Sequence, residues 1–117
     1  MIKLKWLLAE ALKKENVLAF YKAICADSNI KLLPLKFVSI SKGIAMIVHD
    51  KKAGTMDYIG IDMNKASDVE MALLHEFTHQ LLILKNNDCS HSATFRKMLN
   101  KVNDKYMYSK FTNILYA

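Results

Sequence analysis

The sequence predicts an α+β domain built from an N-terminal helix, a small three-stranded sheet and two later helices. Three observations predict this class. Apolar residues recur at helical spacing over residues 3–28, and three short strand-like runs lie between residues 35 and 62. A helix-capping pattern then opens at Ser67. Such an order predicts helices packed on one mostly antiparallel sheet, and 117 residues suit a single domain over 1–117.

The first predicted element is a helix over residues 3–28. Its apolar positions follow the spacing of one helix face and include Leu4, Leu7, Leu8, Ala11, Leu12, Val17, Phe20, Tyr21, Ile24 and Cys25. A break is expected near Glu15 and Asn16, and Pro34 is expected to stop the helix.

Strand-like sequence follows the first helix. Residues 35–41 alternate apolar with polar side chains, residues 44–49 form an apolar run, and residues 58–62 form a third short run. A turn at 42–43 and a polar loop over 50–57 separate them. We therefore predict a small antiparallel sheet.

Two more helices are predicted after the sheet. Ser67 and Glu70 form a capping-box pattern, with Ser67 as N-cap, for a helix from Asp68 to about Lys85. A loop over residues 86–92 precedes a last helix. That helix would bury one face, formed by Phe95, Met98, Leu99 and Val102.

The middle of the capped helix carries the sequence His-Glu-Phe-Thr-His, residues 75–79. Residues four apart share a helix face, so His75 and His79 can bind one Zn²⁺ at about 2.0–2.1 Å. Glu76 can then take a proton from the zinc-activated water as that water attacks a carbonyl, which is metalloprotease chemistry. The alternative interpretation is two solvent-facing histidines on an amphipathic helix.

A catalytic zinc needs a third protein ligand and one open position. His91 is the preferred candidate because it lies in the loop after the helix, where the chain can fold back. Asp88 and Cys89 are alternatives, and Asp88 could instead orient a histidine. A late acidic ligand is a poorer choice, since no glutamate follows Glu76 and Asp104 is badly spaced.

Three other residues are weaker candidates for contacts with the reacting groups. His49 ends a predicted strand and could bind substrate or an oxyanion, or could simply be a partly exposed strand-end histidine. Tyr106 and Tyr108 are placed after the last helix, as transition-state contacts or as core or surface aromatics.

Composition limits the compartment and the partners. Two well-separated cysteines do not form a disulfide framework, so a reducing, cytoplasmic location is expected. The N-terminal apolar run is too short for a signal peptide or a membrane span. A net charge of +6 permits contact with DNA but does not require it. Four lysines form a possible phosphate-contacting stripe or a solvated face: Lys97, Lys101, Lys105 and Lys110.

The zinc motif, its spacing to "HSATF" and the upstream "IGIDMNKASDVEMALLHEFTHQ" resemble the SprT-like (Spartan-type) zinc metallopeptidases. The specific part of the resemblance covers residues 58–99. It implies a zincin-like fold, His75, His79 and His91 as zinc ligands, and Glu76 as the catalytic acid/base. It also implies that Phe95 packs the last helix on the core.

The same resemblance bears on partners. Without a Cys-rich zinc ribbon, the chain resembles a minimal catalytic domain of that family. Relatives act on DNA-protein crosslinks, which implies a protein or peptide substrate, endopeptidase activity, crosslink repair and DNA contact. The alternative function is a non-catalytic module that contains zinc and docks on DNA or on a protein partner. A structural site would be closed by Asp88 or Cys89, whereas a catalytic one would hold water.

Overall fold

Helix α2 (Lys14–Asp27) ends at Asp27, shortly before the left-handed Asn29, rather than at Pro34. The computed structural model describes residues 13–117, so the predicted helix over 3–12 lies outside the described residues. Helix α2 begins after an extended Lys13, which lies two residues before Glu15, where a break was predicted. Asn29 has a φ of 55°, and the Ile30 N–H donates to the Cys25 carbonyl at 3.0 Å. Asparagine tolerates this left-handed turn, so the helix ends well before Pro34.

The sheet is mixed, with one parallel and one antiparallel pairing. Its strands are β1 (Leu35–Phe37), β2 (Ala45–Asp50) and β3 (Thr55–Ile61), in the spatial order β1-β3-β2. β2 pairs antiparallel with β3, as predicted, but β1 pairs parallel with β3. The prediction of an antiparallel sheet is therefore wrong for β1, because the β2–β3 hairpin inserts β3 between the other two strands.

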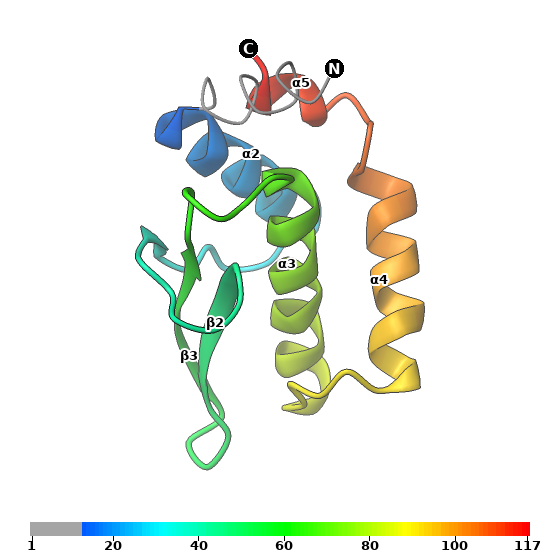
Figure 1. Ribbon diagram of the computed structural model, residues 1–117. Helices are drawn as coiled ribbons and strands as arrows, with labels where there is room; N and C mark the ends of the chain where they lie inside the picture. Colours follow the sequence, from blue (N-terminus) through cyan, green and yellow to red (C-terminus); the bar gives the residue numbers. More distant parts are fainter. Residues whose placement is uncertain (1–12) are drawn as a thin grey trace.

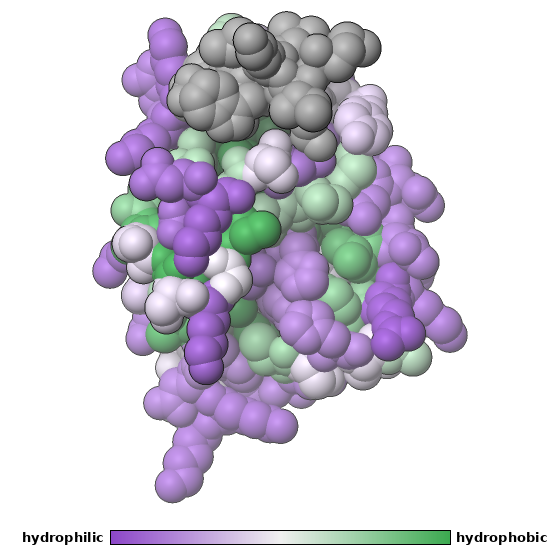
Figure 2. Space-filling view, viewed as in Figure 1, coloured by the Kyte–Doolittle hydropathy of each residue, from purple (hydrophilic) through white to green (hydrophobic). Residues whose placement is uncertain are grey.

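The β2–β3 hairpin is tighter than the sequence suggested. The Gly54 N–H donates to the Asp50 carbonyl at 2.8 Å, and the Asp50 carboxylate accepts from the Ala53 N–H. Gly54 has a φ of 70°, a conformation that glycine adopts without a steric penalty. Residues 55–57, predicted as loop, therefore belong to β3. The protruding tip is hydrophilic (Figure 2).

Helix α3 occupies the centre of the molecule, between the sheet and the last long helix (Figure 1). The C-terminal half of the chain contains α3 (Val69–Asn86), α4 (Ala93–Tyr106) and the short α5 (Thr112–Leu115). α5 was not predicted, because four residues are too few to display a helical period. Across residues 13–117, no helix combines the length and apolar character needed to cross a membrane.

The cap of α3 lies one residue later than predicted. Asp68, rather than Ser67, is the N-cap, and its carboxylate accepts from the Met71 N–H at 3.0 Å. Glu70 does not close a capping box. Its buried carboxylate accepts hydrogen bonds from the Thr112 hydroxyl and the Tyr108 N–H, and so ties the C-terminal segment to α3.

One apolar core joins α2, the sheet, α3 and α4. Its fully buried members include Val17, Phe20, Ile24, Ile59, Ile61, Leu73, Leu74, Phe77 and Leu115. The predicted face of the last helix is confirmed, with Phe95 and Val102 buried and Met98 and Leu99 partly buried. Tyr106 lies in the last turn of α4 and not beyond it.

The buried carboxylate of Asp62 makes the stability of the fold depend on pH. This carboxylate follows β3 and accepts from the Ile40 N–H at 3.0 Å and the Asn64 N–H at 3.1 Å. These hydrogen bonds, the Ile40 bond first, lower the pKa of Asp62 below its usual 3.8. A depressed folded-state pKa contributes stability above pH ~4 that is lost as the pH falls through the folded value.

We therefore expect Asp62→Asn to destabilise the protein most between pH 5 and 7, and less at pH 3. Urea unfolding at pH 3 and at pH 7 measures the loss of unfolding free energy caused by the substitution at each pH. An equal loss at pH 3 and pH 7 would mean that the ionised form of Asp62 is not the stabilising one.

Candidate metal centre

Helix α3 presents His75 and His79 one turn apart on the same face. The helix is held at both ends, by the Asp68 cap and by Asn87, whose backbone N–H donates to the Ile83 carbonyl at 2.9 Å. The two imidazole rings have centroids 5.0 Å apart and meet edge to face. The predicted helical register of the His-Glu-Phe-Thr-His sequence is thus the observed one.

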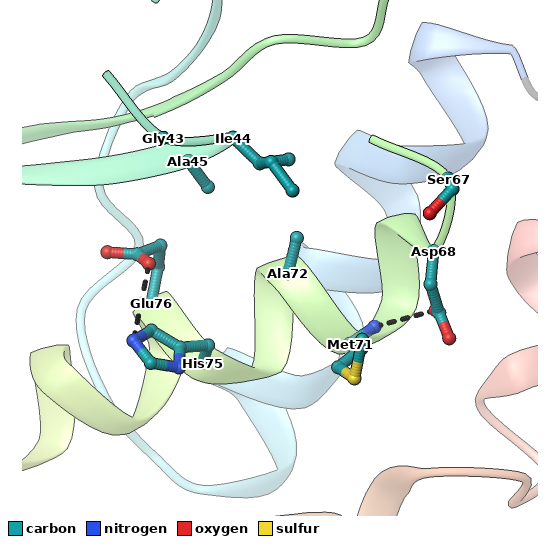
Figure 3. A pocket seen from close by; sticks show the side chains of 9 residues that line it. All are labelled: Gly43, Ile44, Ala45, Ser67, Asp68, Met71, Ala72, His75 and Glu76. Atoms are coloured by element: carbon teal, nitrogen blue, oxygen red, sulfur yellow. Dashed lines mark hydrogen bonds and ion pairs between the residues drawn. The ribbon is translucent and has the colours of Figure 1, made fainter. Parts of the chain in front are cut away.

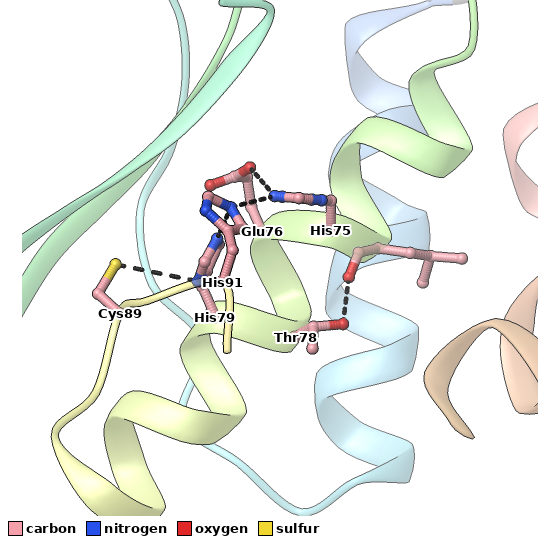
Figure 4. Close-up of polar contacts among 7 residues, drawn as sticks. His75, Glu76, Thr78, His79, Cys89 and His91 are labelled. Atoms are coloured by element: carbon pink, nitrogen blue, oxygen red, sulfur yellow. Dashed lines mark hydrogen bonds and ion pairs between the residues drawn. The ribbon is translucent and has the colours of Figure 1, made fainter. Parts of the chain in front are cut away.

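The loop after α3 returns His91 to these two histidines. Asn87 has a φ of 54°, which turns the chain back, and the Asp88 carboxylate accepts from the Ser90 N–H at 2.9 Å. Ser92 then caps α4 by accepting from the Phe95 N–H at 3.3 Å. The loop is held at both ends, and His91 lies over α3 (Figure 4).

The three histidines lie close enough to bind a metal ion. The Nε2 atom of His91 is 3.1 Å from Nε2 of His75 and 3.1 Å from Nε2 of His79. All three ligand atoms lie within 4.8 Å of one another. A tetrahedral centre with bonds of about 2.0–2.1 Å separates its ligand atoms by roughly 3.3 Å. The two 3.1 Å separations to His91 are close to this value, so the three histidines are near enough to share an ion.

Burial keeps two of these histidines in the form that a metal requires. It lowers the pKa of His79 to about 4, with smaller contributions from His75 and His91. Burial also lowers the pKa of His75, and His91 adds to that effect. Both imidazoles are consequently neutral near pH 7. Each can offer an Nε2 lone pair when its other nitrogen carries the proton.

Glu76 lies beside the histidines but is not one of the converging ligand groups. Its carboxylate Oε2 is 4.0 Å from Nε2 of His75, and its side chain is only 8% exposed. Burial raises the pKa of Glu76 to about 7. A carboxyl group with a pKa close to the working pH can both take up and release a proton.

Phe95 packs against all three histidines. Its ring stacks on His79 at a centroid distance of 4.4 Å and lies 5.0 Å from His75 and from His91. It is 2% exposed and comes from the first turn of α4. Phe95 therefore joins α4 to the core, as expected, and also limits the positions that the imidazoles can adopt.

Gln80 is a residue that sequence reasoning missed. It is fully buried, accepts from the Tyr21 hydroxyl at 2.7 Å and donates to the Lys31 carbonyl at 2.8 Å. These bonds tie α3, immediately after His79, to Tyr21 of α2 and to the segment that follows α2. The available signal was a long polar side chain next to the apolar run that ends α3.

The alternative third ligands do not join the cluster. Sγ of Cys89 is 3.9 Å from Nδ1 of His79, which is not the nitrogen that faces His91. The Asp88 carboxylate accepts from the Ser90 N–H, and its charge slightly counteracts the lowering of the His79 pKa. Cys89 and Asp88 thus border the ligand set.

His49, Tyr106 and Tyr108, the weaker candidates for contacts with the reacting groups, lie away from the histidine cluster. Nε2 of His49 lies 2.7 Å from Oδ1 of Asn87, outside the histidine cluster. Tyr106 is buried, and its hydroxyl donates to the Asp27 carboxylate at 2.7 Å, whereas Tyr108 is 82% exposed. Lys105 also pairs with Asp27, at 3.1 Å.

Comparisons with protein-family models, with curated proteins and with solved structures found no match to this chain. The arrangement of His75, His79, His91 and Glu76 therefore provides the physical basis for a functional assignment. Its features are three converging imidazole nitrogens and one buried carboxyl group beside them.

Proposed function

We propose that this chain is a zinc-dependent metalloprotease that hydrolyses peptide bonds. The observation that carries the proposal is the convergence of three Nε2 atoms with the Glu76 carboxyl group alongside. Three imidazoles suit zinc among the available metals, and three protein ligands leave one position for water or substrate. A bound Zn²⁺ would supply Lewis-acid activation of water and of the scissile carbonyl.

The chain's own residues would then have two roles, metal binding and proton transfer. His75, His79 and His91 would hold the ion as neutral ligands. The Glu76 carboxylate would accept a proton from water as the water oxygen bonds to the carbonyl carbon. When the carbon–nitrogen bond breaks, Glu76 would return that proton to the leaving amine. The low solvent exposure of Glu76 supports this role, because few water molecules compete for its proton.

We also propose that the chain is a SprT-like, zincin-like domain. The supporting features are β3, the Asp68-capped α3 with its zinc motif, the short loop to His91 and Phe95 in the next helix. A cytoplasmic location is part of the proposal, since Cys25 and Cys89 are both free thiols and fit a reducing compartment.

The proposed activity is tested by metal removal and restoration. The substrate is a loosely folded DNA-binding protein, and product is followed by electrophoresis and mass spectrometry. We expect cleavage by the zinc-loaded protein, loss of cleavage after treatment with a chelator, and recovery when one equivalent of Zn²⁺ is added. Cleavage that persists once the protein has been freed of metal would contradict the proposal.

DNA contact is a separate part of the proposal and rests on a smaller surface than the sequence suggested. Lys97 and Lys101 are exposed on α4, while Lys105 is engaged with Asp27. The same assay with and without single-stranded DNA tests this part. If DNA accelerates cleavage and Lys97→Glu/Lys101→Glu removes the acceleration, this surface contacts DNA. Cleavage that ignores DNA would retain the protease and discard DNA contact.

A further inference from the structure

A pocket of about 360 Å³ opens beside the histidine cluster. It shares His75 and Glu76 with the candidate metal centre, so the two are continuous. Its other lining residues lie at or just before the start of β2 and at or just before the first half of α3: Gly43, Ile44, Ala45, Ser67, Asp68, Met71 and Ala72. Any group that occupies this pocket would therefore lie next to the reacting atoms.

The two walls of the pocket are apolar and face each other. Ala45, the first residue of β2, and Ile44 just before it point toward Ala72 on α3, and Met71 precedes Ala72 in the helix (Figure 3). Ile44 is 42% exposed and Met71 is 55% exposed. Hydrophobic surface is exposed over this middle part of the molecule (Figure 2). Covering such side chains with an apolar group removes apolar surface from water and is favourable.

The charged groups of the pocket favour some occupants over others. Its ionisable members are Asp68, His75 and Glu76, and no lysine or arginine lines it. One oxygen of Asp68 accepts from the Met71 N–H, which holds this carboxylate at the far end of the pocket. At the Asp68 end, away from the candidate metal centre, an acidic side chain would meet a like charge with no lysine or arginine to compensate it, so it is disfavoured there.

The length of the pocket fits a short piece of extended peptide. Asp68, the N-cap of α3, and His75 are seven residues apart, which corresponds to about 10 Å along a helix axis. An extended chain advances about 3.3–3.6 Å per residue, so about three residues span this length. His75 and Glu76 line one end of the pocket, which places that end beside the candidate metal centre.

We propose that this pocket selects substrates by binding an apolar side chain, such as leucine, methionine or phenylalanine, of a residue next to the scissile peptide bond. The proposal rests on the proposed protease function and adds the substrate class to it. Ile44 and Met71 are its specificity-determining residues. Apolar pockets of this kind discriminate by roughly 10- to 100-fold.

The test uses peptides that differ only in the residues on either side of one bond. With the zinc-loaded wild type we expect kcat/KM to be roughly 10- to 100-fold higher for leucine, methionine or phenylalanine than for aspartate. Met71→Glu should reduce cleavage of the apolar peptides about tenfold or more and should favour lysine at the same position. Leu84→Glu is the matched control, because Leu84 is also on α3 and 54% exposed but does not line the pocket.

Peptide binding to zinc-loaded Glu76→Gln separates the pocket from the chemistry. Preferential binding of apolar peptides, lost in Met71→Glu combined with Glu76→Gln, would support the pocket even if no peptide is cleaved; absence of cleavage would then count against the protease proposal alone. Cleavage or binding without side-chain preference would overturn the pocket proposal. The same preference in Met71→Glu as in wild type would also overturn it.

Discussion

Replacing Glu76 by glutamine is expected to lower peptide hydrolysis by roughly 10²- to 10⁴-fold while zinc binding is retained. Glutamine has nearly the same shape, but its amide cannot accept and return the proton that the proposed reaction moves. Glu76 is outside the group of three converging ligands, so the site can still bind the ion. Steady-state kinetics with an apolar peptide measures the loss of hydrolysis, and mass spectrometry of the protein measures whether zinc is retained.

Glu70→Gln is the matched control for this variant. Glu70 is also a buried glutamate on α3, but it accepts hydrogen bonds from the C-terminal segment and lies outside the histidine cluster. We expect its kcat/KM to stay within about threefold of wild type. Glu76→Gln with wild-type turnover would contradict the proposed mechanism. Glu76→Gln without zinc would instead assign Glu76 a role in binding the metal.

The part of the site that could be predicted from the sequence is the part fixed by local geometry. A helix places residues four apart on one face, so the proximity of His75 and His79 follows from the register alone. His91 could be expected nearby because six residues separate the end of α3 from the start of α4. A loop this short cannot carry its residues far from the helix end.

The features that were missed depend on contacts between distant segments. The local sequence predicts that Glu70 closes a capping box, but the groups that hydrogen-bond to its carboxylate are 38 and 42 residues away. The parallel pairing of β1 depends on where the β2–β3 hairpin docks, which no local pattern encodes. The pocket has the same origin, since Ile44 and Met71 line one pocket only because the chain at β2 packs on α3.

The second large effect is expected from removing the histidine that the loop supplies. His91→Ala should weaken zinc binding by more than ~100-fold, because loss of residues that merely support a ligand already costs about 10- to 100-fold. Its Nε2 is the only one of the three within 3.1 Å of both others, so its loss leaves two nitrogens on one helix turn. Competition with a chromophoric chelator measures the affinity, and hydrolysis should be lost in parallel.

His49→Ala is the control for His91→Ala. His49 bonds Asn87 outside the cluster, so its replacement should leave the zinc affinity within about threefold of wild type.

Cys89→Ser distinguishes a catalytic from a structural site. If Cys89 only contacts Nδ1 of His79, the serine variant keeps three ligands, an open position and activity. If instead its loss lowers the affinity as far as His91→Ala does, and an anomalous-scattering map places sulfur on the ion, the site is closed. A closed site cannot admit water and substrate together, and that result would favour the binding module over the protease.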